Sequence, residues 1–259
     1  METGSSHGIL SRFNFSVDLK GQVAIVTGAA RGIGRAVADA LAASGVSVLG
    51  IDQISSQEAG EVAEIPHWLE KTVDISQPGE VAQAVDFCIE ELGVPDVLVH
   101  VAGISKPCRV SDMSLEDWHR MIDVNLQPAY YLSRAVLPHM VERGKGCIIF
   151  FSSMIASTGG ETSAHYTAAK SGVEGFSRSM AREVGPRGIR VNVIAPGMID
   201  TVMLDLMPDS QKEKLVHRIP LKRIGFPSDL VGPVFFLISD AGAYVTGQTI
   251  HVNGGMYMK

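Results

Sequence analysis

An apolar run at residues 23–26 leads directly into the glycine-rich segment TGAARGIG, and this junction constrains the fold more than any other part of the sequence. Glycine lets the backbone turn sharply and approach a diphosphate closely, and the N-terminus of a following helix offers free N–H groups and a positive dipole end. Gly28, Gly32 and Gly34 are spaced as G-x-x-x-G-x-G rather than the usual G-x-G-x-x-G, so the turn alone is a weak signal. Its position after a first strand favours a dinucleotide-binding turn over a purely structural one.

Apolar runs and amphipathic stretches alternate along the rest of the chain. The runs cover residues 23–26, 46–51, 71–73, 97–101, 147–151, 189–194 and 249–252, and the helical patterns cover 33–44, 78–92, 115–143 and 166–184. Near-continuous apolar runs are typical of strands that are buried on both faces, and strand–helix alternation predicts a parallel sheet. We therefore expect a single-domain α/β fold of the Rossmann type, with helices on both faces of a doubly wound, mostly parallel sheet of seven strands.

No linker divides the chain. We expect residues 1–18 to form a loose N-terminal leader and residues 19–259 to form one catalytic domain. Residues 198–219 are the only long interior stretch without a strand pattern or a strong helical rhythm. Long irregular segments inside compact domains are often lids, so we predict a lid at about this position.

Composition restricts the partners. The chain has 22 Lys and Arg against 28 Asp and Glu, a net charge of −6, which argues against nucleic acid or an anionic membrane. Three cysteines make no disulfide framework, and no apolar stretch has the length of a signal peptide or a membrane span. Eight histidines are scattered without metal-ligand spacing. We expect a reduced, cytoplasmic protein that binds no metal, nucleic acid or membrane.

Two acidic positions bear on the cofactor. Asp52 follows the second apolar run, where a carboxylate can accept hydrogen bonds from the adenosine ribose and repel a 2′-phosphate, which favours NAD over NADP. Arg31, inside the glycine turn, argues the other way, but we give Asp52 more weight because its charge would lie next to the phosphate. The alternative for Asp52 is a plain surface residue. Asp74 and Ile75 are candidates for the adenine edge, with an ordinary helix N-cap as the alternative for Asp74.

Tyr166 and Lys170 form the second informative pattern. Positions four apart on a helix share a face at a separation of about 6 Å, and an ammonium beside a phenol lowers the pKa of the phenol. Such a tyrosine can exchange a proton with an alcohol oxygen near neutral pH. Ser153 follows the run 147–151, at a strand end where a hydroxyl can orient a carbonyl group. The Y-x-x-x-K spacing alone is weak, whereas its combination with Ser153, Asp52 and the glycine turn is strong.

These residues resemble the short-chain dehydrogenase/reductase family from about residue 19 to residue 258. The likeness rests on the glycine turn and on Ala102-Gly103, Asn125, Ser153, Tyr166, Lys170 and Pro196-Gly197. It implies four catalytic roles: Tyr166 as general acid and base, Lys170 as ligand of the nicotinamide ribose, Ser153 as holder of the substrate oxygen, and Asn125 as the residue that kinks a helix and holds a relay water. From the motif and the resemblance together, the expected cofactor contacts are Gly28, Arg31, Gly32, Ile33, Gly34, Asp52, Asp74, Ile75, Ala102, Gly103, Tyr166, Lys170, Pro196, Gly197, Ile199 and Thr201.

Within that family the chain looks most similar to the 3-oxoacyl-carrier-protein reductases, through residues 181–184 and the tail 251–258. Two features depart from their pattern. Those reductases use NADPH, whereas Asp52 favours NAD, and they carry a basic residue for the carrier protein where this chain has Tyr131. His100 and Val101 also replace two asparagines whose amides brace the central sheet, and we expect His100 to be a packed core histidine.

The sequence therefore predicts an NAD(H)-dependent oxidoreductase that interconverts a secondary alcohol and a ketone. A 3-oxoacyl thioester reductase is the alternative enzyme, and a dinucleotide-binding protein without catalysis is the remote alternative. The substrate stays open among sugars, cyclic alcohols, small hydroxy acids and 3-oxoacyl thioesters. Because relatives are mostly tetramers that pair the helices at 115–143 and 166–184, the resemblance also implies a homotetramer.

Overall fold

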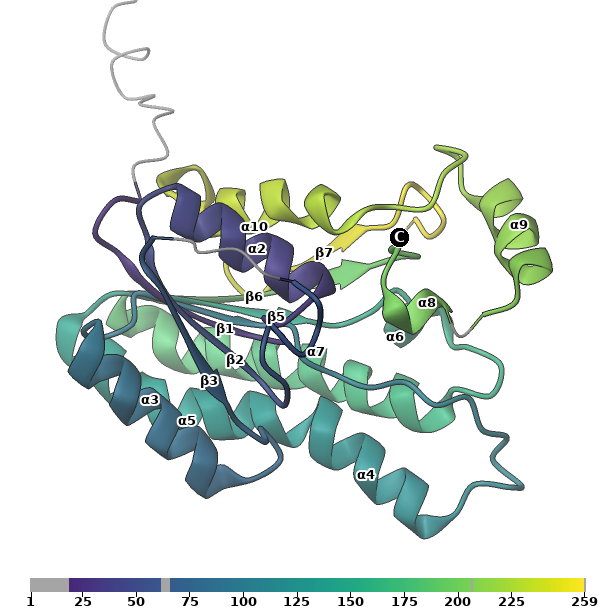
Figure 1. Cartoon of the computed structure of the whole chain (residues 1–259), viewed down its shortest axis with the longest axis horizontal. Coiled ribbons are helices and arrows are strands. Elements are labelled where there is room, and N and C mark those ends of the chain that lie inside the picture. The colour runs from purple at the N-terminus through teal and green to yellow at the C-terminus, as the bar shows by residue number, and fades with distance from the viewer. Residues whose placement is uncertain (1–18, 62–65, 206, 259) are drawn as a thin grey trace, which may run out of the picture.

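A computed structural model describes residues 19–61, 66–205 and 207–258, which form one seven-stranded sheet with helices on both sides (Figure 1). The strands are β1 (Val23–Thr27), β2 (Ser47–Asp52), β3 (Trp68–Thr72), β4 (Val97–His100), β5 (Gly146–Phe151), β6 (Ile189–Pro196) and β7 (Thr249–Val252). Their order is β3-β2-β1-β4-β5-β6-β7, and every neighbouring pair is parallel. Strands β2 and β3 are added on one side of β1, and β4 to β7 are added on the other side. The order therefore reverses between β1 and β4, at the switch point where such sheets bind ligands. The predicted Rossmann-type fold is confirmed.

The strands sort their side chains onto two apolar layers. Alternation along β1 sends Ile25 into a core cluster on one face and Val26 into a second cluster on the other. The interior strands β1, β4 and β5 are buried along their whole length, whereas the edge strands β3 and β7 are partly exposed. This burial on both faces explains why the interior strands read as continuous apolar runs.

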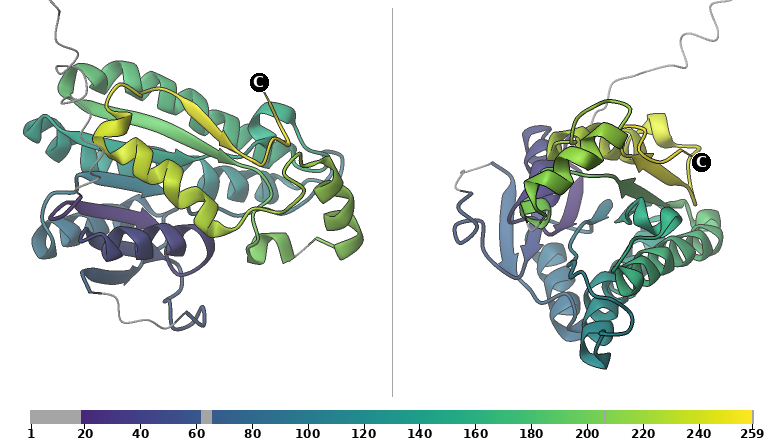
Figure 2. Two further views of the ribbon diagram at one scale, coloured as in Figure 1. Left: turned by 90° about the horizontal axis from the view of Figure 1, so that it is seen from above. Right: turned by 90° about the vertical axis from the view of Figure 1, so that its right-hand side faces the viewer.

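Helices cover each face of the sheet. One face carries α2 (Gly32–Ala43) and α10 (Val231–Ile238), and the other carries α3 (Pro78–Glu91), α5 (Gln127–Arg143) and α7 (Ala164–Val184), as Figures 1 and 2 show. The short helix α6 (Ile155–Thr158) follows β5, and three 3₁₀ helices span Gly185–Arg187, Pro227–Leu230 and Asp240–Gly242.

The predicted helical stretch 115–143 is two helices. α4 (Leu115–Asn125) ends at Asn125, and α5 begins at Gln127 after Leu126. Pro128 lies in the first turn of α5, where its missing N–H and fixed φ are compatible with a helix start. This break places Asn125 at a helix end that faces the sheet.

Residues 198–219 are more regular than the sequence suggested. They contain α8 (Val202–Asp205) and α9 (Asp209–Arg218), and α9 stands away from the sheet beyond its carboxyl edge (Figure 1). The expectation of an irregular segment is wrong because α9 is almost entirely polar and so has no apolar periodicity to detect. The expected leader at 1–18 lies outside the described residues.

Across the residues that the structure describes, no helix has the length and apolar character needed to cross a bilayer. The same residues contain no group of three or more His, Cys, Asp or Glu side chains that could hold a metal ion.

Candidate active site

The glycine turn joins β1 to α2 at the carboxyl edge of the sheet. Gly28 and Gly32 have φ of +70° and +61°, in the left-handed region that favours glycine. A Cβ at Gly34 would lie 2.1 Å from the carbonyl oxygen of Gly28. The turn therefore requires glycine for conformation at two positions and for space at the third.

The N-terminus of α2 leaves this turn with its N–H groups uncapped. Arg31 is the exposed N-cap residue, its side chain makes no cap hydrogen bond, and the first turn, which includes Ile33, holds no acidic residue. A side-chain cap or a carboxylate there would compete with an anion for the free N–H groups. The turn and the helix end thus fit the diphosphate of a dinucleotide.

Asp52 ends β2 next to the glycine turn. Its Oδ2 accepts a hydrogen bond from the backbone N–H of Ala30 at 3.1 Å, and its Oδ1 accepts one from Gln53 N–H at 2.7 Å. The carboxylate is therefore tied to the turn through Ala30 and held by its own chain neighbour Gln53, and it does not stand free on the surface.

Asp74 forms a local turn beyond β3. Its Oδ1 accepts hydrogen bonds from the N–H and the hydroxyl of Ser76, at 2.9 and 2.7 Å. The alternative of an ordinary N-cap is wrong for Asp74, because α3 begins at Pro78 with Gln77 as its N-cap. The side chain of Ile75 is buried in the core, so only its backbone groups are left for a ligand.

The segment after β6 returns to the glycine turn. Pro196 is buried at the end of the strand, and Gly197 follows it half-buried. The side chain of Ile199 packs into the core, whereas Thr201 borders the turn, since a Cβ at Gly32 would meet its Cγ2 at 3.3 Å. Of this segment, Thr201 brings its side chain closest to the glycines.

Ser153 and Tyr166 meet beyond the end of β5. Ser153 is the second residue after that strand, and Tyr166 lies in the first turn of α7. The Ser153 hydroxyl lies close enough to the phenol to lower the pKa of Tyr166 as a hydrogen-bond partner, and both residues are half-buried. Two hydroxyl groups from separate elements therefore form one polar pair at the carboxyl edge of the sheet.

Lys170 lies one helical turn after Tyr166, deeper in the molecule. Its side chain is 3% exposed, and Nζ lies 5.8 Å from the centre of the Tyr166 ring. Nζ donates a hydrogen bond to the carbonyl oxygen of Phe151 at 2.9 Å. A Cβ at Gly103 would lie 3.3 Å from Nζ, so glycine is needed for the loop after β4 to approach the lysine. The predicted shared face of Tyr166 and Lys170 is thus present.

The pKa of the Tyr166 phenol is not lowered in this arrangement. Burial raises the pKa of Tyr166 to about 12, and the hydrogen bond with Ser153 acts in the opposite direction. Burial also lowers the pKa of Lys170 to about 8. The phenol pKa that the sequence led us to expect below its usual value is raised in this structure, because desolvation of the phenolate outweighs the hydrogen bond with Ser153.

Asn125 fastens the loop after β4 to the end of α4. It is fully buried, its Oδ1 accepts a hydrogen bond from Ile104 N–H at 3.2 Å, and its Nδ2 donates to the Ile104 carbonyl at 3.0 Å. A Cβ at Gly103 would lie 2.5 Å from Oδ1. The side chains of Asn125 and Lys170, from different helices, therefore occupy the space that a side chain at position 103 would need. Gly103 is the neighbour of Ala102.

The structure thus brings the four predicted catalytic residues together and places most of the predicted cofactor residues around the same edge. The sequence interpretation missed one residue of this edge, Thr27. Its Oγ1 accepts hydrogen bonds from the N–H groups of Val101 and Ala102, both at 3.1 Å. The only signal was its place directly before Gly28, which does not distinguish an anchoring hydroxyl from a buried strand residue.

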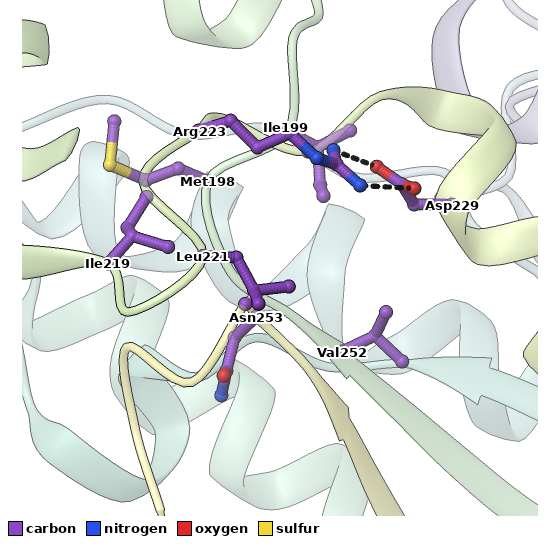
Figure 3. Close-up of a pocket in the computed structure, with 10 residues that line it drawn as sticks. Met198, Ile199, Ile219, Leu221, Arg223, Asp229, Val252 and Asn253 are labelled. Atoms are coloured by element: carbon purple, nitrogen blue, oxygen red, sulfur yellow. Dashed lines mark hydrogen bonds and ion pairs between the residues drawn. The ribbon is translucent and has the colours of Figure 1, made fainter.

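The segment that follows β6 lines a cavity of about 160 Å³ (Figure 3). It is bounded by the two ends of the 198–225 segment and by the C-terminal tail, and an ion pair between Arg223 and Asp229 closes one side. Its lining residues are Met198, Ile199, Ile219, Leu221, Arg223, Gly225, Asp229, Val252, Asn253 and Gly254. None of Ser153, Tyr166 and Lys170 lines it, so this cavity is not the place of the hydroxyl pair.

A parallel sheet with a glycine turn at its switch point, and a serine, a tyrosine and a lysine at the same edge, define a Rossmann-type protein built for a dinucleotide. A family model described as enoyl-(acyl carrier protein) reductase matches residues 28–257. The chain belongs to the short-chain dehydrogenase/reductase family, whose members are oxidoreductases.

Relatives with similar sequences include 3-oxoacyl-[acyl-carrier-protein] reductases. The protein of that name from Escherichia coli K12 is 40% identical over 247 residues, which are 93% of this chain and 100% of the relative. The one from Pseudomonas aeruginosa is 41% identical over the same shares. A crystal structure of a candidate gluconate dehydrogenase from Agrobacterium tumefaciens is also similar, with a TM-score of 0.88 and 35% identity over 93% of this chain and 97% of that chain.

Proposed function

We propose that this chain is an NAD(H)-dependent oxidoreductase that interconverts a secondary alcohol and a ketone. The observation that carries the proposal is the meeting of Ser153, Tyr166 and Lys170 beside the loop at Gly103. That loop in turn touches the glycine turn, since a Cβ at Gly28 would lie 3.0 Å from Ala102. Proton-transfer groups and a dinucleotide cradle therefore share one edge of the sheet.

Each side chain has a defined part in ketone reduction. Ser153 orients the substrate oxygen through a hydrogen bond, and Tyr166 donates its phenolic proton to that oxygen. The nicotinamide supplies the hydride when it is bound. The Lys170 ammonium stabilises the negative charge that the phenol acquires, and Asn125 keeps the loop at Gly103 in place. In alcohol oxidation the same groups act in reverse, with the Tyr166 phenolate as the base.

The preference for NAD rests on Asp52. Its carboxylate is held at the glycine turn by the N–H groups of Ala30 and Gln53. A fixed carboxylate at the end of the second strand accepts hydrogen bonds from ribose hydroxyls and repels a 2′-phosphate. Arg31 is exposed at the same turn, and its side chain makes no hydrogen bond to the helix end, so the anchored carboxylate outweighs it.

The second candidate is a 3-oxoacyl thioester reductase. It is supported by the 3-oxoacyl-[acyl-carrier-protein] reductases, which share about two residues in five with this chain. The counter-argument is Tyr131, which stands where the resemblance to these reductases implies a basic residue for the carrier protein. Its hydroxyl donates a hydrogen bond to Gln127 within its own helix.

The experiment that separates these candidates is a substrate panel followed by absorbance of the reduced nicotinamide. It contains secondary alcohols, hydroxy acids, polyhydroxy acids and their ketones, together with acetoacetyl thioesters, each tested with NADH and NADPH. Turnover of an alcohol or ketone with NAD(H) supports the first function. Turnover of the thioester with NADPH alone supports the second, and NAD binding without any turnover would contradict both.

A further inference from the structure

His100 is buried at the end of β4 and binds a hydroxyl at the neighbouring strand end. Its Nδ1 lies 2.7 Å from Oγ1 of Thr27, and the imidazole is 2% exposed. That oxygen already accepts the N–H groups of Val101 and Ala102. Because a hydroxyl carries one proton, Thr27 donates it to Nδ1, and the imidazole proton is on Nε2.

The imidazole keeps this acceptor role over the physiological pH range. Burial lowers the pKa of His100 to about 3, and the nearby Lys170 ammonium acts in the same direction. A protonated imidazole could not accept from Thr27, since both of its nitrogens would be donors. The charged group that acts on His100 is therefore the same lysine that lies next to Tyr166.

The other nitrogen shows that the histidine is not there for packing alone. Nε2 is buried and has no hydrogen-bond partner among the described residues. A buried donor without a partner is destabilising, and an aliphatic side chain would fill the same apolar surroundings without it. The role of His100 therefore depends on the hydrogen bond at Nδ1.

The Thr27 hydroxyl connects the two halves of the candidate site. On one side Thr27 precedes Gly28, the first glycine of the dinucleotide turn. On the other side Ala102 precedes Gly103, where an added Cβ would lie 3.3 Å from Nζ of Lys170. A single oxygen thus holds the cofactor turn and the loop against the lysine in a fixed relation.

We propose that His100 is a positioning residue of the oxidoreductase site. Its Nδ1 accepts a hydrogen bond from the Thr27 hydroxyl. The lone pairs of Oγ1 then remain directed at the N–H groups of Val101 and Ala102, which keeps the loop at Gly103 in place between the glycine turn and Lys170. The kinetic part of this inference rests on the proposed function, whereas its effect on dinucleotide binding does not.

The test compares variants that keep or remove each partner of this hydrogen bond. His100→Asn keeps a side-chain acceptor, and His100→Leu removes it; Thr27→Ser keeps the hydroxyl, and Thr27→Val removes it. For each variant, NADH dissociation is measured by fluorescence, kcat and KM by turnover, and Tm by calorimetry. His100→Leu and Thr27→Val should each weaken NADH binding about tenfold, the size expected for one lost hydrogen bond, and lower kcat. The His100→Asn and Thr27→Ser variants should retain most of the NADH affinity and most of kcat.

A double variant gives the sharpest reading. Because the two residues act through one bond, His100→Leu combined with Thr27→Val should bind NADH no worse than Thr27→Val alone. The Tm of His100→Leu should stay close to that of the wild type, because the variant removes the unpartnered donor at Nε2 and leaves the buried Thr27 hydroxyl without its acceptor. NADH binding and kcat of His100→Leu equal to the wild type would overturn the proposal, and so would losses that add in the double variant. If His100→Leu fails to fold, His100→Val, which also removes the acceptor, takes its place in the comparison with His100→Asn.

Tyr166→Phe is assayed in parallel to separate this inference from the proposed function. If Tyr166→Phe keeps full turnover, the proposed proton transfer fails, while the NADH-binding comparison still decides the role of His100. If Tyr166→Phe is inactive and His100→Leu is unchanged, only the inference about His100 fails.

Discussion

At the scale of single residues, burial sets the protonation of the site. The Tyr166 phenol has its pKa raised to about 12 and the Lys170 ammonium has its pKa lowered to about 8. At neutral pH the site therefore holds a neutral phenol beside a cation. This is the state from which a proton can be given to a carbonyl oxygen.

The pH dependence of ketone reduction follows from these two groups. We expect kcat for reduction to be constant below about pH 7 and to fall above pH 8, because Lys170 loses the charge that stabilises the developing phenolate as the pH rises through its pKa. Steady-state rates between pH 6 and 10 measure this. Lys170→Arg keeps its charge, so its rate, although lower, should show no fall near pH 8; a fall at the same pH in Lys170→Arg would assign it to another group.

The proposed preference for NAD over NADP depends on the charge of Asp52. Asp52→Asn removes the negative charge but keeps an acceptor, so we expect kcat/KM with NADPH to rise relative to NADH by about tenfold or more. Both cofactors are compared at fixed substrate concentration. Asp86→Asn is the matched control, because Asp86 is exposed on α3 and outside the candidate site, and it should leave the ratio within about twofold. An unchanged ratio in Asp52→Asn contradicts the assignment.

At the scale of elements, the sequence predicted what apolar periodicity can report. All seven strands were predicted because buried strands of a parallel sheet are continuous apolar runs. The start of β3 was predicted three residues too late, since this edge strand begins at Trp68 and mixes polar and apolar residues. α9 escaped prediction because it is almost entirely polar, whereas the break between α4 and α5 falls at Asn125, where the resemblance implied a kinked helix. The catalytic residues were predicted from spacing and resemblance, whereas the anchoring by Thr27 and His100 needed three-dimensional contacts between separate strands.

The junction of β1 with α2 gives a direct test at this scale. Gly34→Ala places a methyl group 2.1 Å from the Gly28 carbonyl oxygen, so the turn must shift. We expect NADH binding to weaken by at least tenfold, or Tm to drop by several degrees, as a backbone clash of this kind costs on the order of 1–3 kcal/mol. Calorimetry and NADH fluorescence measure both.

Gly79→Ala is the control for that substitution. Gly79 lies in the first turn of α3, and a Cβ there meets nothing within 4 Å. Its Tm should be unchanged or slightly raised, because alanine favours the helix more than glycine does. Equal behaviour of Gly34→Ala and Gly79→Ala would mean that the tight approach at the glycine turn does not matter.

At the scale of the whole molecule, the carboxyl edge of one sheet gathers every group of the candidate site, while large apolar side chains stand exposed on the helices α4 and α5. Trp118 is 38% exposed and Tyr130 is 50% exposed on these helices. Exposed aromatic groups of this kind are enriched at protein–protein interfaces. We infer that these helices, with α7, pair subunits of a homotetramer.

The assembly is tested by light scattering. The wild type should have about four times the 27.7 kDa mass of the chain. Tyr130→Glu should lower the mass to that of a dimer or monomer, because a charge would be buried without a partner. Gln83→Glu, on an exposed position of α3, should leave the mass unchanged. A wild-type monomer would contradict the inference.

The central claim is that the Tyr166 hydroxyl transfers the proton between the protein and the substrate oxygen. The most direct measurement is turnover of Tyr166→Phe on the best substrate of the panel, with NADH binding measured on the same sample by fluorescence. We expect kcat to fall by about 10²- to 10⁴-fold, the usual contribution of a positioned acid or base, while NADH binds as tightly as before. Turnover of Tyr166→Phe within about twofold of the wild type would contradict it.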